Sequence, residues 1–362
     1  MDRRHFLAAG LLGPFALADR GHAQTPARQP AAATPLPPIG DMHFHSFFVG
    51  PGGAPSKYDS RPLARTLAAG GATLVAWSVV GDVLWVDSKT YKQKAEPKPG
   101  EPLGWFQREL GRVKAHVAEQ GLKVVLVPAD VDAALQGVPH VVLAVEGANF
   151  VENDVGRLQP AYDQGLRHLQ LVHYTRNTIG DFQTEPAEHK GLTAIGKAVV
   201  SECNRLGILI DLAHCTPATV RDALAISRAP MVWSHGSVVR GRETPGATAV
   251  WRRRQLSLEG AKAIAGKGGV VGIWALNVDV GRTVGAYGDR LAELAGWLGE
   301  DHVAFGTDIN GLGAFAMLSS YAEVRQVVEH WQRQQLPEAR IRKLAIGNYA
   351  RVLKAAMLGR QA

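Results

Sequence analysis

Cysteine is scarce in this chain: only Cys203 and Cys215 occur among 362 residues. Two thiols cannot form the disulfide framework of a small secreted protein, so an apolar core has to hold the fold together. Cys215 directly follows His214, and this neighbour raises the question of a ligand or nucleophile role. We favour the simpler interpretation, a small buried residue at the end of a strand.

Long apolar runs are missing as well. Beyond the N-terminus no stretch reaches the roughly 18 apolar residues that a membrane-spanning helix needs. Hydrophobic residues make up 46% of the chain and charged residues 20%, which is the composition of an ordinary globular protein with a substantial core. The length permits one large domain or two of ordinary size.

The positive charge is not clustered. The formal net charge is +7, but no long run of lysine and arginine and no nucleic-acid-binding motif accompany it. We therefore expect no nucleic-acid partner. We assign the charge to solubility, with some attraction for anionic substrates. Nothing in the sequence decides the oligomeric state, and a homo-oligomer stays open.

The first 23 residues have the features of an export signal. Arg3 and Arg4 precede a short apolar run that glycine and proline interrupt, so this run would make a poor membrane anchor. Cleavage after Ala23 would suit a signal peptidase, and Arg-Arg-x-Phe-Leu resembles a twin-arginine signal. An ordinary basic N-terminus is the alternative. We expect a signal peptide over 1–23, a flexible Pro- and Ala-rich linker over 24–38, and a periplasmic protein without a stable membrane anchor.

From residue 39 onward, short apolar runs alternate with longer amphipathic stretches. The runs are rich in valine, isoleucine and leucine and are uniformly apolar, as strands buried on both faces are. Nine runs are candidate strands: 39–44, 72–80, 123–127, 141–145, 166–172, 207–213, 230–234, 268–276 and 302–307.

Helical patterns lie between most of these runs, for example at 193–207, 216–227 and 289–299. Alternating strands and helices predict an α/β protein with a parallel sheet. About eight repeats favour a single-domain (β/α)8 TIM-type barrel over 39–362, with the run 123–127 as an extra or irregular element. An open doubly wound sheet is the alternative, but no Gly-x-Gly-x-x-Gly follows the first run.

Polar residues at the ends of the apolar runs are the candidate functional residues, because a barrel brings the carboxyl ends of its strands to one rim. Six run ends carry such groups: His43 with His45, Glu146, His173, His214, His235 and Asp308. Imidazoles and carboxylates together suit zinc or a similar divalent ion. His43 and His45 can reach one metal, because side chains repeat every two residues along a strand. The pattern predicts a metal site within this set.

The order of the motifs resembles that of the membrane (renal) dipeptidase family of zinc metallopeptidases. The matching pieces are DMHFH (41–45), VEG (145–147), LQLVHYTRNTIGD (169–181), DLAHCT (211–216), WSHGSV (233–238), FGTDINGLG (305–313) and IGNYARVL (346–353). The resemblance implies a (β/α)8 barrel that holds two divalent metal ions, zinc in that family. It further implies a small-molecule substrate, a dipeptide, which is hydrolysed by a water activated at the binuclear zinc site.

The resemblance also implies a role for each site residue. The implied metal ligands are Glu146 as the bridge, His214 and His235 on one ion, and His43 with His45 on the other. His173 would polarise the scissile carbonyl, and Asp308 would carry a proton between the attacking water and the leaving nitrogen, which agrees with the chemistry of such groups. Asp181 could position His173 or only cap a loop.

His45 departs from the family, which normally has aspartate at this position. A neutral ligand leaves the inner shell more positive by one charge, which should weaken the hold on the second metal. We hypothesise that Asp308 compensates by acting at least partly as a ligand. Asp41 is expected to support His43 from outside the metal shell.

The loop after His235 is the second departure. The family places an Arg-Asn pair there, whose arginine binds the terminal carboxylate of the dipeptide, and the nearest match is Arg254-Gln255. A solvated basic loop is the other interpretation, and rival candidates are Arg240, Arg252 and Arg253. This departure bears on the identity of the substrate more than on the type of reaction. The alternative function is a related amidohydrolase-type barrel acting on another amide or a lactone. A non-catalytic periplasmic binding protein is a further alternative, which the presence of Glu146, His173 and Asp308 disfavours.

Overall fold

A computed structural model describes residues 35–46, 62–239 and 249–360. The expected signal peptide and all but the last residues of the expected linker lie outside the described residues. None of the helices in these three ranges is long and apolar enough to cross a membrane.

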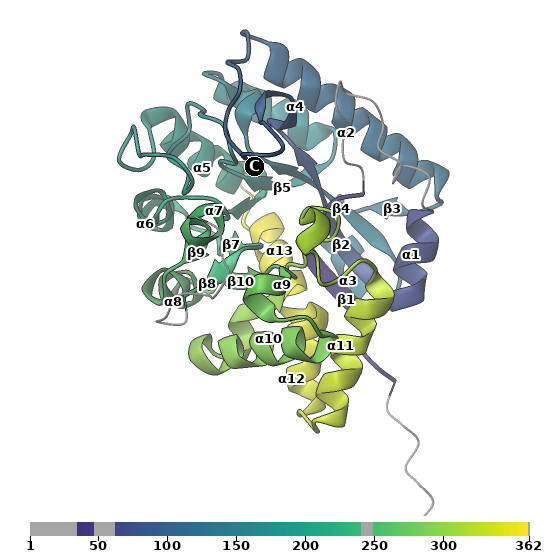
Figure 1. The fold of residues 1–362 in the computed structure, drawn as a ribbon. Helices are drawn as coiled ribbons and strands as arrows, with labels where there is room; N and C mark the ends of the chain where they lie inside the picture. Colours follow the sequence, from purple (N-terminus) through teal and green to yellow (C-terminus); the bar gives the residue numbers. More distant parts are fainter. Residues whose placement is uncertain (1–34, 47–61, 240–248, 361–362) are drawn as a thin grey trace, which may run out of the picture. The chain divides into compact units, whose positions relative to one another are not determined.

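Eight parallel strands form a nearly closed barrel (Figure 1). In spatial order they are β1 (Ile39–Phe44), β2 (Ala72–Val80), β4 (His140–Glu146), β5 (Leu166–Gln170), β6 (Leu209–Asp211), β7 (Val232–Trp233), β10 (Val270–Ile273) and β11 (Val303–Phe305). The first and last strands meet beyond their ends, where Asp308 N donates to His43 O at 3.0 Å and His45 N donates to Ile309 O at 3.0 Å. The predicted (β/α)8 barrel is confirmed.

The run 123–127 is the irregular element that the sequence predicted. Only β3 (Lys123–Val124) is extended, and it pairs with β4 alone, off the barrel path. The run stops because Pro128 begins α3 (Pro128–Leu135), and the Asp130 carboxylate accepts hydrogen bonds from Leu126 N and Val127 N at 2.8 and 2.9 Å. The side chains of Leu126 and Val127 therefore remain half exposed.

Helices connect the strands and cover the barrel (Figure 1). They are α1 (Leu63–Gly70), α2 (Glu101–Glu119), α4 (Leu158–Asp163), α5 (Ala194–Leu206), α6 (Pro217–Ile226), α7 (Ala249–Arg253), α8 (Leu258–Gly266), α9 (Asn277–Val280), α10 (Val284–Leu298), α11 (Tyr321–Arg333), α12 (Glu338–Arg342) and α13 (Asn348–Leu358), besides α3. Local sequence sets their limits: Thr216 caps α6 by accepting from Thr219 N. Gly207 ends α5 in the left-handed conformation. The predicted helix 289–299 begins earlier, at Val284, because Thr283 caps it.

Alternate strand residues pack into two different apolar clusters. Val141, Leu143 and Val145 of β4 belong to the cluster shared with the covering helices. The residues between them pack inside the barrel against the last helix. This inner cluster includes Met42, Leu74, Ala76, Val142, Ala144, Leu209, Val232, Val270 and Ala304, with Ile346, Tyr349 and Val352 from the α13 region. Because apolar side chains and α13 fill this part of the barrel, the polar side chains gather at the carboxyl ends of the strands.

Candidate metal centre

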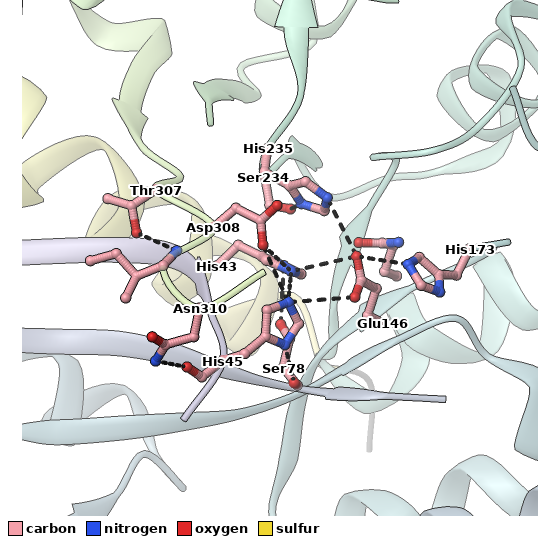
Figure 2. A network of polar contacts seen from close by, with 12 residues as sticks. His43, His45, Ser78, Glu146, His173, Ser234, His235, Thr307, Asp308 and Asn310 are labelled. Carbon is pink, nitrogen blue, oxygen red and sulfur yellow. Dashed lines mark hydrogen bonds and ion pairs between the residues drawn. The ribbon is translucent and has the colours of Figure 1, made fainter. Parts of the chain in front are cut away.

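His43 near the end of β1 and His45 just after it lie at the rim of the barrel, where their Nε2 atoms are 3.1 Å apart (Figure 2). Ser78 of β2 orients both rings. Nδ1 of His45 donates to the Ser78 carbonyl oxygen at 2.9 Å, and Nδ1 of His43 lies 3.1 Å from Ser78 Oγ. The carbonyl fixes one proton of His45 on Nδ1, so its Nε2 faces the cluster, as in a metal ligand. Burial lowers the pKa of His45, but the Asp308 and Glu146 carboxylates raise it overall, so a metal that binds at Nε2 would displace a proton.

Glu146, the last residue of β4, lies at the centre of the cluster (Figure 2). Its carboxylate oxygens lie 3.3–3.6 Å from the Nε2 atoms of five histidines: His43, His45, His173, His214 and His235. The side chain is almost completely buried, and burial raises the pKa of Glu146. A buried carboxylate that faces so many imidazoles has the position of a bridging ligand.

His214 and His235 form the second pair of imidazoles, with their Nε2 atoms 3.1 Å apart. His214 follows β6 with a backbone φ of +70°, and Ser234 Oγ lies 3.0 Å from Nδ1 of His235. Burial, reinforced by the neighbouring cations, holds the pKa of both rings, and that of His43, well below the usual range. These imidazoles are therefore neutral and can offer lone pairs.

The donor set fits a divalent metal. Two nitrogens bound tetrahedrally to one zinc at about 2.0–2.1 Å would lie about 3.3–3.4 Å apart. Both histidine pairs show Nε2 separations of 3.1 Å. Two neutral imidazoles stabilise each other only slightly at this distance, so a shared metal ion explains the close approach better than a direct contact does. Ligand atoms lie within 4.8 Å of one another in three groups: His43–Glu146–His235, His43–His45–Asp308 and Glu146–His173–His214.

Asp308 stands on the side of the first histidine pair. Its Oδ1 lies 3.3 Å from Nε2 of His45 and 4.0 Å from Nε2 of His43 (Figure 2). The residue has a φ of +55°, and a Cβ at Gly311 would come within 1.9 Å of Oδ1. The turn after β11 thus needs glycine at position 311 so that the Asp308 carboxylate can face the cluster.

Asp82 is the functional residue that sequence reasoning missed. It is fully buried, and its Oδ1 accepts from Nδ1 of His173 at 2.6 Å. Oδ2 accepts from Tyr174 N at 3.0 Å, Thr175 N at 2.9 Å and Thr175 Oγ1 at 3.0 Å. Asp82 follows the run 72–80 after one glycine, so the search for polar residues at run ends could have found it.

The Asp82–His173 pair favours the imidazolium form. Burial by itself lowers the pKa of His173, but the carboxylates of Asp82 and Glu146 raise it above its usual value. Burial likewise opposes ionisation of Asp82, yet His173 and the surrounding donors lower its pKa overall. Asp181, the alternative partner, does not reach the ring. It accepts from the backbone N–H groups of a loop instead: Glu188 at 2.8 Å, and His189 and Gly191 at 2.9 Å.

Asp41 supports His43 through the backbone rather than through the ring. Its Oδ1 accepts from His43 N at 3.2 Å and Thr307 N at 3.0 Å, and its Oδ2 accepts from the hydroxyls of Thr307 and Tyr321 at 2.5 and 3.0 Å. Burial raises the pKa of Asp41 to about 6, against these hydrogen bonds. The expected support is therefore a tie between β1 and the turn after β11, and Ser78 is the partner of the His43 ring.

Neither cysteine belongs to the cluster. Both are buried thiols without a disulfide partner, and burial raises the pKa of Cys215 well above its usual range. Cys215 lies outside the three groups of ligand atoms, as expected for a small buried residue at a strand end.

A cavity of about 400 Å³ opens onto the cluster and contains Arg254 in its wall. The Arg254 guanidinium is fully buried. Nη1 donates to Gln183 Oε1 at 3.2 Å, and the guanidinium carbon lies 5.2 Å from the ring centre of Trp274. Nε and Nη2 have no hydrogen-bond partner among the described residues. A buried cation without a carboxylate partner is costly, so the arrangement is that of a receptor for an anion.

The rival arginines are placed differently. Arg253 donates from Nη1 to Thr184 O at 2.8 Å, and neither Arg252 nor Arg253 is among the residues that line the cavity. Arg240 lies outside the described residues.

The chain is similar to known dipeptidases in sequence and in fold. The sequence profile of membrane dipeptidase (Peptidase family M19) matches residues 67–361. Dipeptidase verJ of Clonostachys rogersoniana is 29% identical over 174 residues, which span 47% of this chain and only 43% of that relative.

Solved structures extend the likeness over the barrel. The metallopeptidase dipeptidase AC superposes with a TM-score of 0.72 at 21% identity, covering 89% of this chain and 99% of that chain. A metallopeptidase from Rhodobacter sphaeroides, liganded with a phosphinate mimic of the dipeptide L-Ala-D-Ala, has a TM-score of 0.71 at 20% identity and covers 88% of this chain and 99% of its own. At these identities the likeness shows a shared fold.

Proposed function

The chain belongs to the membrane dipeptidase family, and from this premise we propose that it is a metal-dependent dipeptidase. The observation that carries the proposal is Arg254, a buried guanidinium with two unpartnered nitrogens in the wall of the cavity onto which the Glu146–histidine cluster opens. A peptide that pairs its terminal carboxylate with Arg254 can place its amide bond at the cluster. A short substrate with a free carboxyl end suits this cavity.

We propose two divalent ions, zinc in the first instance, held by the strand-end residues. Glu146 would bridge them, and the donors at its two sides would complete the shells: His214 and His235 at one, His43 and His45 with Asp308 Oδ1 at the other. When bound, such ions would acidify a water and polarise the substrate carbonyl. The two pairs of Nε2 atoms at 3.1 Å support this ligand set.

Three residues would handle the substrate. Arg254 holds the terminal carboxylate through the two N–H-bearing nitrogens that lack partners, and so fixes the position of the peptide bond. The imidazolium of His173, held by Asp82, donates from Nε2 to the carbonyl oxygen as negative charge develops there. Oδ2 of Asp308, the oxygen that is not assigned to the metal, takes the proton of the attacking water and returns it to the nitrogen as the carbon–nitrogen bond breaks.

The activity is tested with dipeptides, including those with a D-residue at the second position, against lactones and N-acyl amino acids. We expect hydrolysis of dipeptides, abolished by a chelator and restored by zinc. Turnover of lactones alone would overturn the proposal in favour of the related amidohydrolase chemistry. Protein that is purified without chelator and holds no metal would favour a binding protein.

Arg254→Met tests the carboxylate clamp. Removing one partner of a buried charge pair should lower kcat/KM for L-Ala-L-Phe about a hundredfold or more. The wild type should treat L-Ala-L-phenylalaninamide, which lacks the carboxylate, as poorly as the variant does. Arg253→Met is the matched control, because that neighbouring guanidinium donates to a backbone carbonyl away from the cavity lining. An equal loss in both variants would contradict the assignment of Arg254.

We also propose export of the folded protein to the periplasm by a twin-arginine signal over residues 1–23. The paired Arg3 and Arg4 before a short apolar run support this. Replacing both arginines by lysine should leave the protein in the cytoplasmic fraction of the host. Normal export of that variant would contradict the proposal.

A further inference from the structure

We infer that the preferred dipeptides carry a bulky apolar, above all aromatic, side chain on their C-terminal residue. The inference rests on the proposed function, because Arg254 can fix the position of that residue only if it binds the terminal carboxylate.

Two tryptophans stand next to the proposed clamp. The Arg254 guanidinium carbon lies 5.2 Å from the ring centre of Trp274, and Arg254 N donates to Trp251 O at 3.1 Å. Both tryptophans line the cavity, together with Leu276 and Leu312. The Cα substituent of a residue whose carboxylate meets Arg254 is therefore expected beside the Trp274 ring, in a lining that also includes Trp251 and the two leucines.

Both tryptophans have defined packing or hydrogen-bond partners. Nε1 of Trp274 donates to Asp279 Oδ2 at 3.0 Å, and its backbone N donates to Gly236 O at 3.0 Å. The Trp251 ring packs edge-on against Phe315 with ring centres 4.5 Å apart. A preorganised apolar wall lets the substrate side chain be buried without first ordering the protein, so the gain from burial goes into binding.

The described residues of the cavity lining disfavour a basic side chain. Apart from Glu146 and Asp308 of the proposed metal centre, no carboxylate lies among the described residues of the lining. Besides Arg254 and the His173 imidazolium, the charged group among the described lining residues is Lys94. Other residues of this lining are aliphatic or aromatic: Val80, Val83, Leu84, Val86, Tyr91 and Tyr174. A lysine or arginine side chain on the substrate would lose its water here without gaining a counter-ion.

The volume is compatible with this preference. The cavity of about 400 Å³ falls at the lower end of the range of small-molecule sites, roughly 300–1,000 Å³. It is thus large enough for a dipeptide with one large side chain, and a glycine at the C-terminal position would leave the indole wall uncovered. One methylene in such a pocket already changes kcat/KM by about tenfold or more.

The experiment compares kcat/KM of the metal-loaded protein for L-Ala-Gly, L-Ala-Leu, L-Ala-Phe and L-Ala-Lys, the last three with both configurations of the second residue. We expect phenylalanine and leucine to exceed glycine by about tenfold to a few hundredfold, and lysine to be poorest. Hydrolysis of all four at equal rates, or a preference for lysine, would overturn the inference while leaving the dipeptidase function intact. Failure of every dipeptide would overturn the proposed function and this inference with it.

Trp274→Ala tests whether the indole wall causes the preference for a bulky apolar side chain. The ratio of kcat/KM for L-Ala-L-Phe to that for L-Ala-Gly should fall about tenfold, whereas a loss that only disturbed Arg254 would lower both substrates together. Trp251→Ala, at a less buried position, provides a second variant should Trp274→Ala not fold. Trp297→Ala is the matched control, since its ring also lies under an arginine, Arg290, at 5.1 Å, but outside the cavity lining. An unchanged ratio in both cavity variants would refute the assignment.

Discussion

Replacing Asp82 by asparagine keeps the shape of the side chain and removes its charge, so it isolates what this carboxylate does for His173. The hydrogen bonds decide how the amide would sit. Three donors converge on Oδ2, from Tyr174 N, Thr175 N and Thr175 Oγ1, and one donor, His173 Nδ1, meets Oδ1.

Turning the amide nitrogen toward the three donors would leave two buried backbone N–H groups without an acceptor, at about 1–3 kcal/mol each. Turning it toward His173 sacrifices only one contact, which the ring can rebuild by accepting at Nδ1. The second orientation is therefore favoured by a few kcal/mol. It forces His173 into the neutral tautomer that carries its proton on Nε2.

This tautomer still presents an N–H group to the substrate carbonyl, and it lacks only the positive charge. The same change in a serine-protease triad costs about 10⁴ in kcat because a proton then occupies the nitrogen that must accept one. Here the required proton is on the correct nitrogen, so we expect a smaller loss in kcat, about 10- to 100-fold, with little change in KM. Asp82→Ala leaves all four donors without an acceptor, so this variant should lose more activity and should also be less stable.

The pH profile should change in a defined direction. Burial opposes protonation of His173, but Asp82 and Glu146 raise its pKa above the usual value, so the imidazolium persists to higher pH in the wild type. Without the Asp82 charge this pKa falls, and the alkaline limb of kcat should move to lower pH. Nitrogen-15 NMR of labelled histidine should show the proton on Nε2 of His173 in the variant.

Asp181→Asn is the matched control, because Asp181 also accepts three backbone N–H groups but contacts no histidine ring of the cluster. We expect its kcat and pH profile to match those of the wild type. A kcat for Asp82→Asn within twofold of the wild type, or a His173 proton that stays on Nδ1, would refute the reasoning.

Further predictions concern the metal shell and the loops around it. His45→Asp adds a negative charge beside Asp308, so the second metal should be retained at a higher chelator concentration, measured by elemental analysis after dialysis; unchanged stoichiometry and affinity would contradict this and show that the charge at position 45 does not limit metal retention. Ser78→Ala removes the hydroxyl at His43 Nδ1 but not the carbonyl that orients His45, and metal affinity should fall about tenfold or more in a competition titration. Burial opposes ionisation of Asp181, yet its backbone donors lower the pKa. The ionised Asp181 carboxylate therefore stabilises the fold at pH values above its ordinary pKa of about 3.9. This stabilisation is lost as the pH falls through the lower pKa of the folded state. The melting temperatures of wild type and Asp181→Asn should accordingly differ at pH 7 and converge toward pH 2, and a constant difference would contradict this.

The strands and the metal-site candidates were readable from the sequence because both depend on short-range patterns. A strand buried on both faces is a short, uniformly apolar run, and the polar residue that stops the run marks its end. Glu146 is the last residue of β4, and Asp308 lies three residues beyond β11. The spacing of two between His43 and His45 similarly requires that their side chains share one face.

The limits of the strands and the partner of Asp41 could not be predicted, because they depend on contacts that the hydrophobic pattern of the sequence does not contain. The apolar runs are longer than the strands they contain, because the chain turns at the rim of the barrel. The run 207–213, for example, contains only the strand Leu209–Asp211, and His214 follows with a φ of +70°. Whether Asp41 met the His43 ring depended on where Thr307 and Tyr321 would lie, and these residues hold the carboxylate at the backbone instead.

By itself the sequence determined the barrel, the family and the side chains that end its strands, because hydrophobic periodicity and the order of motifs are properties of neighbouring residues. Only the tertiary structure decided which of these side chains touch. It paired Asp82 with His173 across 91 positions of the chain, placed Ser78 against both His43 and His45 and distinguished Arg254 from Arg252 and Arg253 by the cavity it lines. Hydrogen bonds of about 3 Å depend on how loops that are distant in the sequence pack together at the rim, and local sequence patterns do not predict this packing.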